Sequence, residues 1–359
     1  MSTLQKSEKT ARRVLYLDYL RILATLFVML IHISAQNLDY VEKNSYPWWA
    51  FQAVNQAARW AVPMFVMLSG ALFLDPSRQV TVKNLYRKSI FRMVTAFAFW
   101  SAVYVLDRLL HGLDLSSAKT AFLKGHYHMW YFHLVIGLYI ITPVVRKITE
   151  TKAVSGYFLV MAIVFVIVLP EGIATLQRLD IPHTATILSA VKSNLGGMNF
   201  PFPKVFLIYY VMGSYLYHYD LPGWLRKTVY AVGIAAYLSS VLDLEALTGG
   251  VITQFFPFGE LYVNTGMSAA VFLFGKHVLS RIRLSPKGEK FLCGLSACTF
   301  GMYLVHPMIL DKLRDVAGLH TLRFDPIVSM VVITALVMGL SGVCSYVLHQ
   351  IPVLKKYVV

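Results

Sequence analysis

Apolar segments long enough to cross a lipid bilayer recur along this chain, and they limit its fold more than any other feature. The stretch from Pro326 to His349 contains no Asp, Glu, Lys or Arg. A helix that spans the hydrocarbon core needs about 20 mostly apolar residues. The whole chain is 57% hydrophobic and only 14% charged, so a water-soluble core would not bury its apolar surface. The sequence therefore predicts an all-α membrane protein.

Ten such segments predict about ten transmembrane helices in a single domain over residues 1–359, with the helices between about 15 and 350. Four segments are strongly apolar, and six reach the length of a span only with their flanking residues. The strong segments are 22–38, 153–170, 291–310 and 326–348, and the weaker ones are 60–74, 93–106, 129–145, 205–219, 227–242 and 261–275. The connection 171–204 contains several Gly and Pro residues, and we interpret it either as a lid or acceptor-binding loop or as a plain connector.

The basic residues predict the orientation of these helices. With ten spans and an inner N-terminus, 21 of the 33 Lys and Arg residues fall in the inner segments. Because cytoplasmic loops are enriched in Lys and Arg, the N-terminus and the C-terminus are both predicted to be short cytoplasmic tails. The net charge of +15 is spread between apolar runs and does not gather on one soluble face, so nucleic acid is not an expected partner. The expected partner is the lipid bilayer.

The first predicted helix contains the charged residues Asp18 and Arg21 and the titratable residue His32. Its basic N-terminal flank is typical of a signal peptide, but these residues and the lack of a clear cleavage site favour a retained helix. Arg21 and His32 are eleven residues apart, which places them on one helix face about 16 Å apart along the axis. Asp18 precedes Arg21 by three residues and can pair with it.

This placement suggests a path for an elongated cofactor that carries phosphates at one end. Arg21 lies near the cytosolic end, where a guanidinium can bind phosphate, and His32 lies in the outer half, where an imidazole can accept a proton from a sugar hydroxyl. The pantetheine arm of coenzyme A has a length comparable to their separation. The alternatives are that Arg21 anchors the helix at the membrane surface and that His32 bonds a backbone carbonyl.

Other polar side chains extend these two predicted sites. Ser69 and Gly70 form a small-residue patch that allows close helix packing, and Ser69 is also a candidate ligand donor. The remaining candidates also have structural interpretations. The basic residues are also consistent with cytoplasmic positive charge, and Trp130 and Tyr303 with an interfacial aromatic belt. The donor-side candidates are Arg87, Lys88 and Arg92, and the acceptor-cleft candidates are His128, Trp130, Tyr303 and His306.

Metal binding is not expected in this chain. Its histidines are not accompanied by a carboxylate or cysteine ligand set, and its cysteines have no ligand spacing. The three cysteines, Cys293, Cys298 and Cys344, all fall in apolar stretches. We therefore predict no metal site, no disulfide and no permanently bound cofactor.

Five segments in this order resemble the membrane acyltransferase-3 family. They are LDYLRILATLFVMLIH, VPMFVMLSGALF, HMWYFHLVIGLYIITPVV, FLIYYVMGSYL and FGMYLVHPMI. The resemblance covers about residues 15–350 and is greatest to the enterobacterial common antigen O-acetyltransferase type. It implies transfer of an acetyl or longer acyl group from acyl-CoA, as co-substrate, to a hydroxyl of a cell-surface glycan or lipid-linked saccharide.

The resemblance also implies roles for individual residues. His32 matches the catalytic histidine, Arg21 a donor-binding residue, Trp130 the aromatic position that opens the fourth helix, and Tyr303 and His306 a late tyrosine–histidine pair. The chain departs from the family in one motif. Its basic residues are spread from Arg87 to Arg92, where the family has an adjacent arginine pair. The residue that makes the second phosphate contact therefore stays open. The hydrolase-like extracytoplasmic domain of some members is not expected.

The resulting prediction is a multi-pass O-acyltransferase of the bacterial inner membrane, with His32 as base or acyl carrier. The resemblance implies the O-acetyl type. Proteins of polysaccharide assembly are further candidate partners. Two other classes stay open. Intramembrane His and Arg residues also build transporters and flippases, although the sequence shows no internal repeat and no matched pair of interrupted helices. A non-catalytic assembly factor for polysaccharide synthesis would bind the acceptor without donor turnover.

Overall fold

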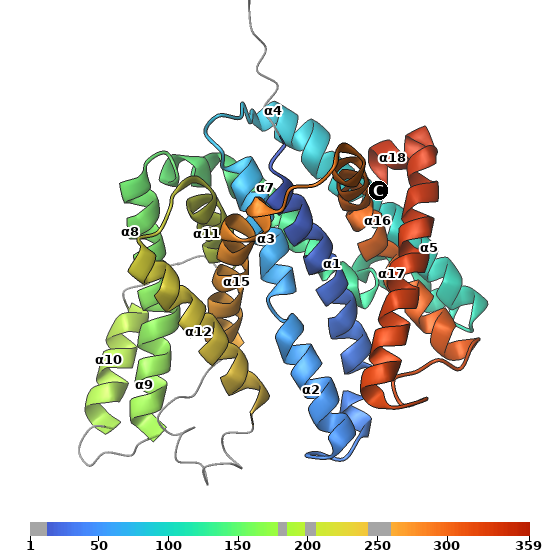
Figure 1. The fold of residues 1–359 in the computed structure, drawn as a ribbon, viewed down its shortest axis with the longest axis horizontal. Helices are drawn as coiled ribbons and strands as arrows, with labels where there is room; N and C mark the ends of the chain where they lie inside the picture. The colour runs from blue at the N-terminus through green and yellow to red at the C-terminus, as the bar shows by residue number, and fades with distance from the viewer. Residues whose placement is uncertain (1–12, 179–184, 198–205, 243–259) are drawn as a thin grey trace, which may run out of the picture.

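The computed structural model describes residues 13–178, 185–197, 206–242 and 260–359, and within them it contains helices and no strand. Most helices run roughly along one direction as a bundle (Figure 1). The helices of the first half are α1 (Leu15–Ala35), α2 (Tyr46–Ala58), α3 (Ala61–Phe73), α4 (Val82–Asn84), α5 (Phe91–Leu110), α6 (Leu115–Lys124), α7 (Trp130–Ile148), α8 (Lys152–Ile163) and α9 (Leu169–Arg178). Those of the second half are α10 (Ala185–Gly197), α11 (Phe206–His218), α12 (Gly223–Val241), α15 (Glu260–His277), α16 (Pro286–Asp315), α17 (Pro326–Gln350) and α18 (Pro352–Tyr357).

Six helical stretches in the described residues are long and apolar enough to cross a membrane. They are Leu15–Tyr40, Val82–Leu110, Leu115–Ile148, Lys152–Ala174, Pro286–Asp315 and Pro326–Gln350. These stretches indicate a multi-pass membrane protein, as the sequence predicts. The remaining four predicted spans correspond to shorter or less apolar helices, so the number of ten and the cytoplasmic position of the termini stay predictions.

The second predicted span is an interrupted helix. The sequence places an apolar core at 60–74, whereas the structure begins the helix at Tyr46 and breaks it at Arg59 and Trp60, between α2 and α3. Pro63 lies at the start of α3 and has no backbone N–H to donate to the carbonyl of Arg59. The break therefore has a local cause, and it places the partly buried Arg59 at a turn within the bundle.

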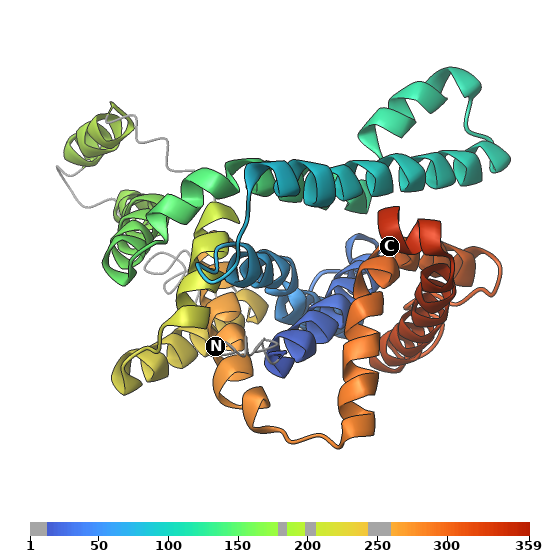
Figure 2. The same cartoon turned by 90° about the horizontal axis from the view of Figure 1, so that it is seen from above.

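Helix α1 occupies the centre of the bundle, where it packs against α2, α3, α15, α16 and α17. It begins at the same end of the molecule at which the chain ends after α18 (Figure 1). Helix α5 lies along one side of the bundle, and α6 turns back beside it when the molecule is seen from above (Figure 2). This arrangement surrounds α1 with helices from both halves of the chain.

Helices α3 and α11 approach each other closely because each presents a glycine to the other. A Cβ atom added at Gly70 would lie 1.8 Å from the carbonyl oxygen of Tyr210, and one added at Gly213 would lie 2.1 Å from the carbonyl oxygen of Met67. Such distances are possible only without a side chain, since backbone atoms cannot move aside. The expected close helix packing at Ser69–Gly70 is thus confirmed.

We expect Gly213→Ala to destabilise the protein, because its methyl group would push α3 and α11 apart. Overpacking of this kind typically costs about 1–3 kcal/mol, and a lower midpoint of thermal unfolding in detergent would measure it. Gly137→Ala is the matched control, since a Cβ atom there meets nothing within 4 Å. Alanine has a higher helix propensity than glycine, so the control should be neutral or stabilising. Equal midpoints for both variants would contradict the close approach.

Candidate active site

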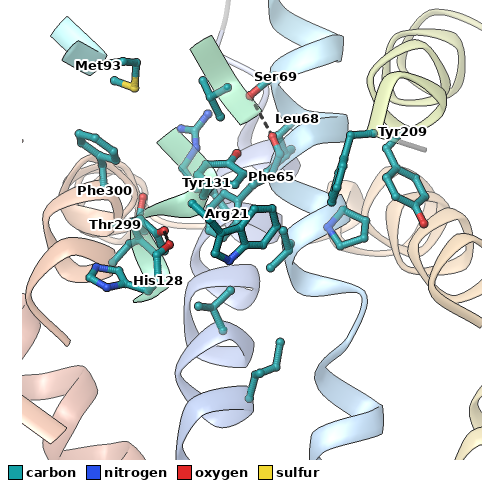
Figure 3. A pocket seen from close by; sticks show the side chains of 18 of the residues that line it. Arg21, Phe65, Leu68, Ser69, Met93, His128, Tyr131, Tyr209, Thr299 and Phe300 are labelled. Atoms are coloured by element: carbon teal, nitrogen blue, oxygen red, sulfur yellow. Dashed lines mark hydrogen bonds between the residues drawn. The ribbon is translucent and has the colours of Figure 1, made fainter. Parts of the chain in front are cut away.

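A cavity of about 800 Å³ lies beside α1, lined by residues of eight helices or their flanking turns. Figure 3 shows part of its wall, in which Arg21 from α1, Ser69 from α3, Tyr131 from α7 and Thr299 from α16 surround one space. The structure brings seven of the candidate site residues into this wall: Arg21, His32, Ser69, Arg92, His128, Trp130 and Tyr303. Side chains from segments far apart in sequence thus meet at one cavity.

Arg21 is held near the start of α1 by a buried polar group. Its Nη1 lies 3.7 Å from Oδ1 of Asp18 and 3.3 Å from Oγ of Ser296 in α16. Asp18, which is 3% exposed, accepts two shorter hydrogen bonds from Arg13, at 2.7 and 2.6 Å, and one from Ser296 at 2.6 Å. Asp18 therefore contacts Arg21 as predicted, but its principal partner is Arg13. Since Asp18 does not line the cavity, it positions the Arg21 side chain from behind.

His32 lies at the other end of α1 among aromatic rings. Its ring centroid is 5.2 Å from that of Tyr127 and 5.2 Å from that of His306. No described residue hydrogen-bonds to the imidazole of His32, so its nitrogen atoms remain available to a ligand in the cavity. A helix of this length separates Arg21 and His32 by about 16 Å along its axis, and both side chains line the same cavity.

Arg92, near the start of α5, contributes a second guanidinium on the Arg21 side of the cavity. Its Nη2 donates to the main-chain oxygen of Val359, and its guanidinium lies 5.8 Å from the ring centroid of Phe300. The Nε atom of Arg92 is buried and has no hydrogen-bond partner in the described part of the chain. Arg87 and Lys88, by contrast, are exposed and do not line the cavity, so the structure does not bring them to Arg21.

The candidate acceptor residues gather around His32. The hydroxyl group of Tyr303 donates to the backbone carbonyl of His128, and Nδ1 of His128 lies 2.9 Å from Nδ1 of His126. His306 is fully buried behind the cavity wall, where its Nδ1 lies 2.7 Å from the carbonyl oxygen of Tyr303. These contacts join the turn before α7 to α16 next to His32.

Two further candidates are placed differently from one another. Trp130 lines the cavity but remains 47% exposed, which fits a position at its mouth. Ser69 also lines the cavity, and its hydroxyl group donates to the carbonyl oxygen of Phe65 at 2.9 Å. That bond leaves the lone pairs of the Ser69 oxygen available to a ligand.

The described residues of α9 and α10, which belong to the connection 171–204, do not line the cavity, so a lid role for them gains no support.

Several cavity residues were missed from the sequence. Arg59 is the most informative, because it adds a third guanidinium to the wall. Arg59 directly precedes the apolar core 60–74. The sequence therefore predicts it only as a charged residue of an outer loop. The other polar residues that were missed are Tyr131, Tyr139, Tyr209, Asn264 and Thr299.

The charges of the wall have one sign. Among the described residues, three arginines and no Asp or Glu line the cavity. Guanidinium groups in a largely apolar wall favour an anionic ligand, although Arg21 already has Asp18 as a partner behind the wall. Among the described residues, no group of three His, Cys, Asp or Glu side chains has the arrangement of metal ligands.

Comparison with known protein families shows which family this chain matches. The acyltransferase domain of the acyltransferase-3 family matches residues 14–346, nearly the whole chain. The comparisons with curated proteins and with solved structures found no match. The matched range contains every residue of the cavity wall. The chain therefore belongs to the acyltransferase-3 family, and its apolar helices fit a membrane acyltransferase.

Proposed function

We propose that this protein transfers an acyl group, in the first instance acetyl, from cytosolic acyl-CoA to a hydroxyl group of a cell-surface glycan or lipid-linked saccharide in the bacterial inner membrane. This acceptor class is the one used by the O-acetyltransferase type that the sequence resembles. The family match supports acyl transfer. The donor, the acceptor and the roles of the residues below are our proposal.

One observation carries the proposal: a single cavity has guanidinium groups toward one end of α1 and a histidine toward the other. The groups of acyl-CoA follow a matching order, with phosphates at one end and the thioester at the other. Arg21 and Arg92 would bind its phosphates, since a guanidinium matches phosphate oxygens bidentately. The pantetheine arm would then extend along the apolar wall and present the thioester to His32.

In the first route, His32 acts as a general base. Its imidazole accepts the proton of the acceptor hydroxyl while the hydroxyl oxygen attacks the thioester carbonyl. The carbon–sulfur bond breaks, the new ester bond forms, and the leaving thiolate takes the proton back from the imidazolium as free CoA. This route needs no group beyond the two substrates and His32.

In the second route, His32 carries the acyl group. An imidazole nitrogen attacks the thioester carbonyl, the carbon–sulfur bond breaks, and CoA leaves as the thiol with the imidazole proton. The acceptor oxygen then attacks the acyl-imidazole, the carbon–nitrogen bond breaks, and the hydroxyl proton returns to the imidazole. Both routes give the same products, and only the first forms no covalent enzyme intermediate.

The proposal is tested with the full chain in lipid nanodiscs and acetyl-CoA labelled with ¹⁴C. Glycans extracted from a strain that lacks the gene serve as acceptors, and mass spectrometry of the same glycans identifies the modified sugar. We expect free CoA and an alkali-labile glycan ester in equal amounts. Release of CoA without the ester would indicate hydrolysis of the donor and refute the proposal. No release with any extract would also refute it and would leave transport or assembly as the function.

A further inference from the structure

Arg59 has no role in the donor path described above, although it lines the same cavity as His32. It stands at the break between α2 and α3, where Pro63 interrupts the helical hydrogen bonds. The break places a partly buried arginine on the wall of a largely apolar cavity. A guanidinium in such a place is costly unless it has a partner or a function.

Neighbouring residues fix the position of this guanidinium. The Nε of Arg59 donates to Oδ1 of Asn55 at 3.0 Å. Asn55 is 2% exposed, and its amide donates to the carbonyl oxygen of Ile31 at 3.2 Å and to Oγ of Ser34 at 3.0 Å. Ile31 and Ser34 flank His32 in the chain, so Asn55 ties Arg59 to the helical turn that carries the histidine.

Among the described residues, the terminal nitrogen atoms of Arg59 have no hydrogen-bond or ion-pair partner, and no acidic side chain lines the cavity. A planar guanidinium presents paired N–H donors that match a carboxylate or phosphate. The contacts of Asn55 place Arg59 beside the turn of α1 that carries His32, and His32 lies about 16 Å along α1 from Arg21. In coenzyme A the phosphates lie at the end remote from the thioester, so they would not reach Arg59 when bound at Arg21.

We infer that Arg59 binds an anionic group, a carboxylate or a phosphate, that stands beside the acyl group being transferred. The inference rests on the proposed function and narrows its substrate class to one that carries negative charge close to the reacting hydroxyl. Two sources supply such a group. It belongs either to the acceptor, as in a uronic acid or a sugar phosphate, or to the far end of a dicarboxylic acyl chain on the donor.

The test measures substrate preference as a ratio of kcat/KM values in nanodiscs. In the acceptor arm, acetyl-CoA is the donor, and 4-nitrophenyl β-glucuronide is compared with 4-nitrophenyl β-glucoside, and N-acetylglucosamine 1-phosphate with N-acetylglucosamine. In the donor arm, succinyl-CoA is compared with acetyl-CoA on the neutral glucoside. The wild type should prefer the anionic partner by about tenfold or more in one arm, the size expected for charge-assisted hydrogen bonds.

Arg59→Gln should reduce that preference to near unity, and Arg59→Lys should retain part of it, since lysine keeps the charge without the planar fork. Arg323→Gln is the control, because Arg323 is exposed and does not line the cavity, and it should keep the wild-type preference. Size-exclusion chromatography checks the fold of each variant. The lysine variant provides the measurement if the glutamine variant does not fold.

The possible outcomes separate this inference from the proposed function. A wild type that uses neutral and anionic partners equally, or prefers the neutral ones, overturns the inference while leaving acyl transfer intact. The same conclusion follows if the Arg59 variants keep the preference of the wild type. If the wild type transfers no acyl group to these probes or to the extracted glycans, the proposed function itself fails.

Discussion

We expect His32→Ala to reduce acyl transfer by about a hundred- to ten-thousand-fold, the usual contribution of a positioned general base. The loss should appear in kcat, because His32 would act on the hydroxyl proton or on the acyl group during reaction. The donor's dissociation constant should change much less, since the proposed phosphate contacts are about 16 Å away along α1. Labelled acetyl-CoA in nanodiscs supplies both measurements, turnover from product ester and affinity from equilibrium binding.

His133→Ala is a matched control, because His133 is exposed near the start of α7 and does not line the cavity. It should keep the wild-type rate. Retention of transfer within a few-fold by His32→Ala would remove His32 from the chemistry under either route. The two routes are separated by quenching wild type with donor alone, since only the acyl-histidine route leaves label on the protein that hydroxylamine removes.

Local patterns in the sequence predicted the centre of the site. The charged residues of α1 stand out because an apolar segment surrounds them, and the helical period places Arg21 and His32 on one face. The structure shows α1 as one uninterrupted helix with both side chains in one cavity. The small-residue patch at Gly70 was likewise predictable, since close helix packing needs residues without bulk.

Contacts that lie outside a single helix could not be predicted from such patterns. Arg13 is the principal partner of Asp18. Helical spacing could not predict this contact, because Arg13 precedes the first residue of α1. The contact of Arg92 with Val359 joins residues 267 positions apart. Arg59 resembled an ordinary loop charge, because the sequence does not show which flanking residues form the cavity wall. For Arg92 and Arg59 the cause is the same: tertiary packing decides which of many polar residues face the cavity.

The second large effect is expected at Arg21. Replacement by alanine should raise the dissociation constant for acetyl-CoA by about ten- to a hundredfold, which corresponds to the loss of charge-assisted hydrogen bonds. The fold should survive, because Asp18 keeps its hydrogen bonds from Arg13 and Ser296 and so does not become an unpaired buried charge. Equilibrium binding of labelled acetyl-CoA measures the change.

Truncated donors reveal which part of coenzyme A Arg21 contacts. S-acetylpantetheine lacks every phosphate, so the wild type and Arg21→Ala should bind it equally weakly. Acetyl-dephospho-CoA lacks only the 3′-phosphate, and an undiminished effect of the mutation on this donor would place Arg21 at the diphosphate. Arg283→Ala removes the same charge from an exposed position outside the cavity and should leave all three affinities near those of the wild type. If Arg21→Ala instead weakened acceptor binding and spared acetyl-CoA, the donor would have to enter the cavity in the opposite direction, with its thioester remote from His32.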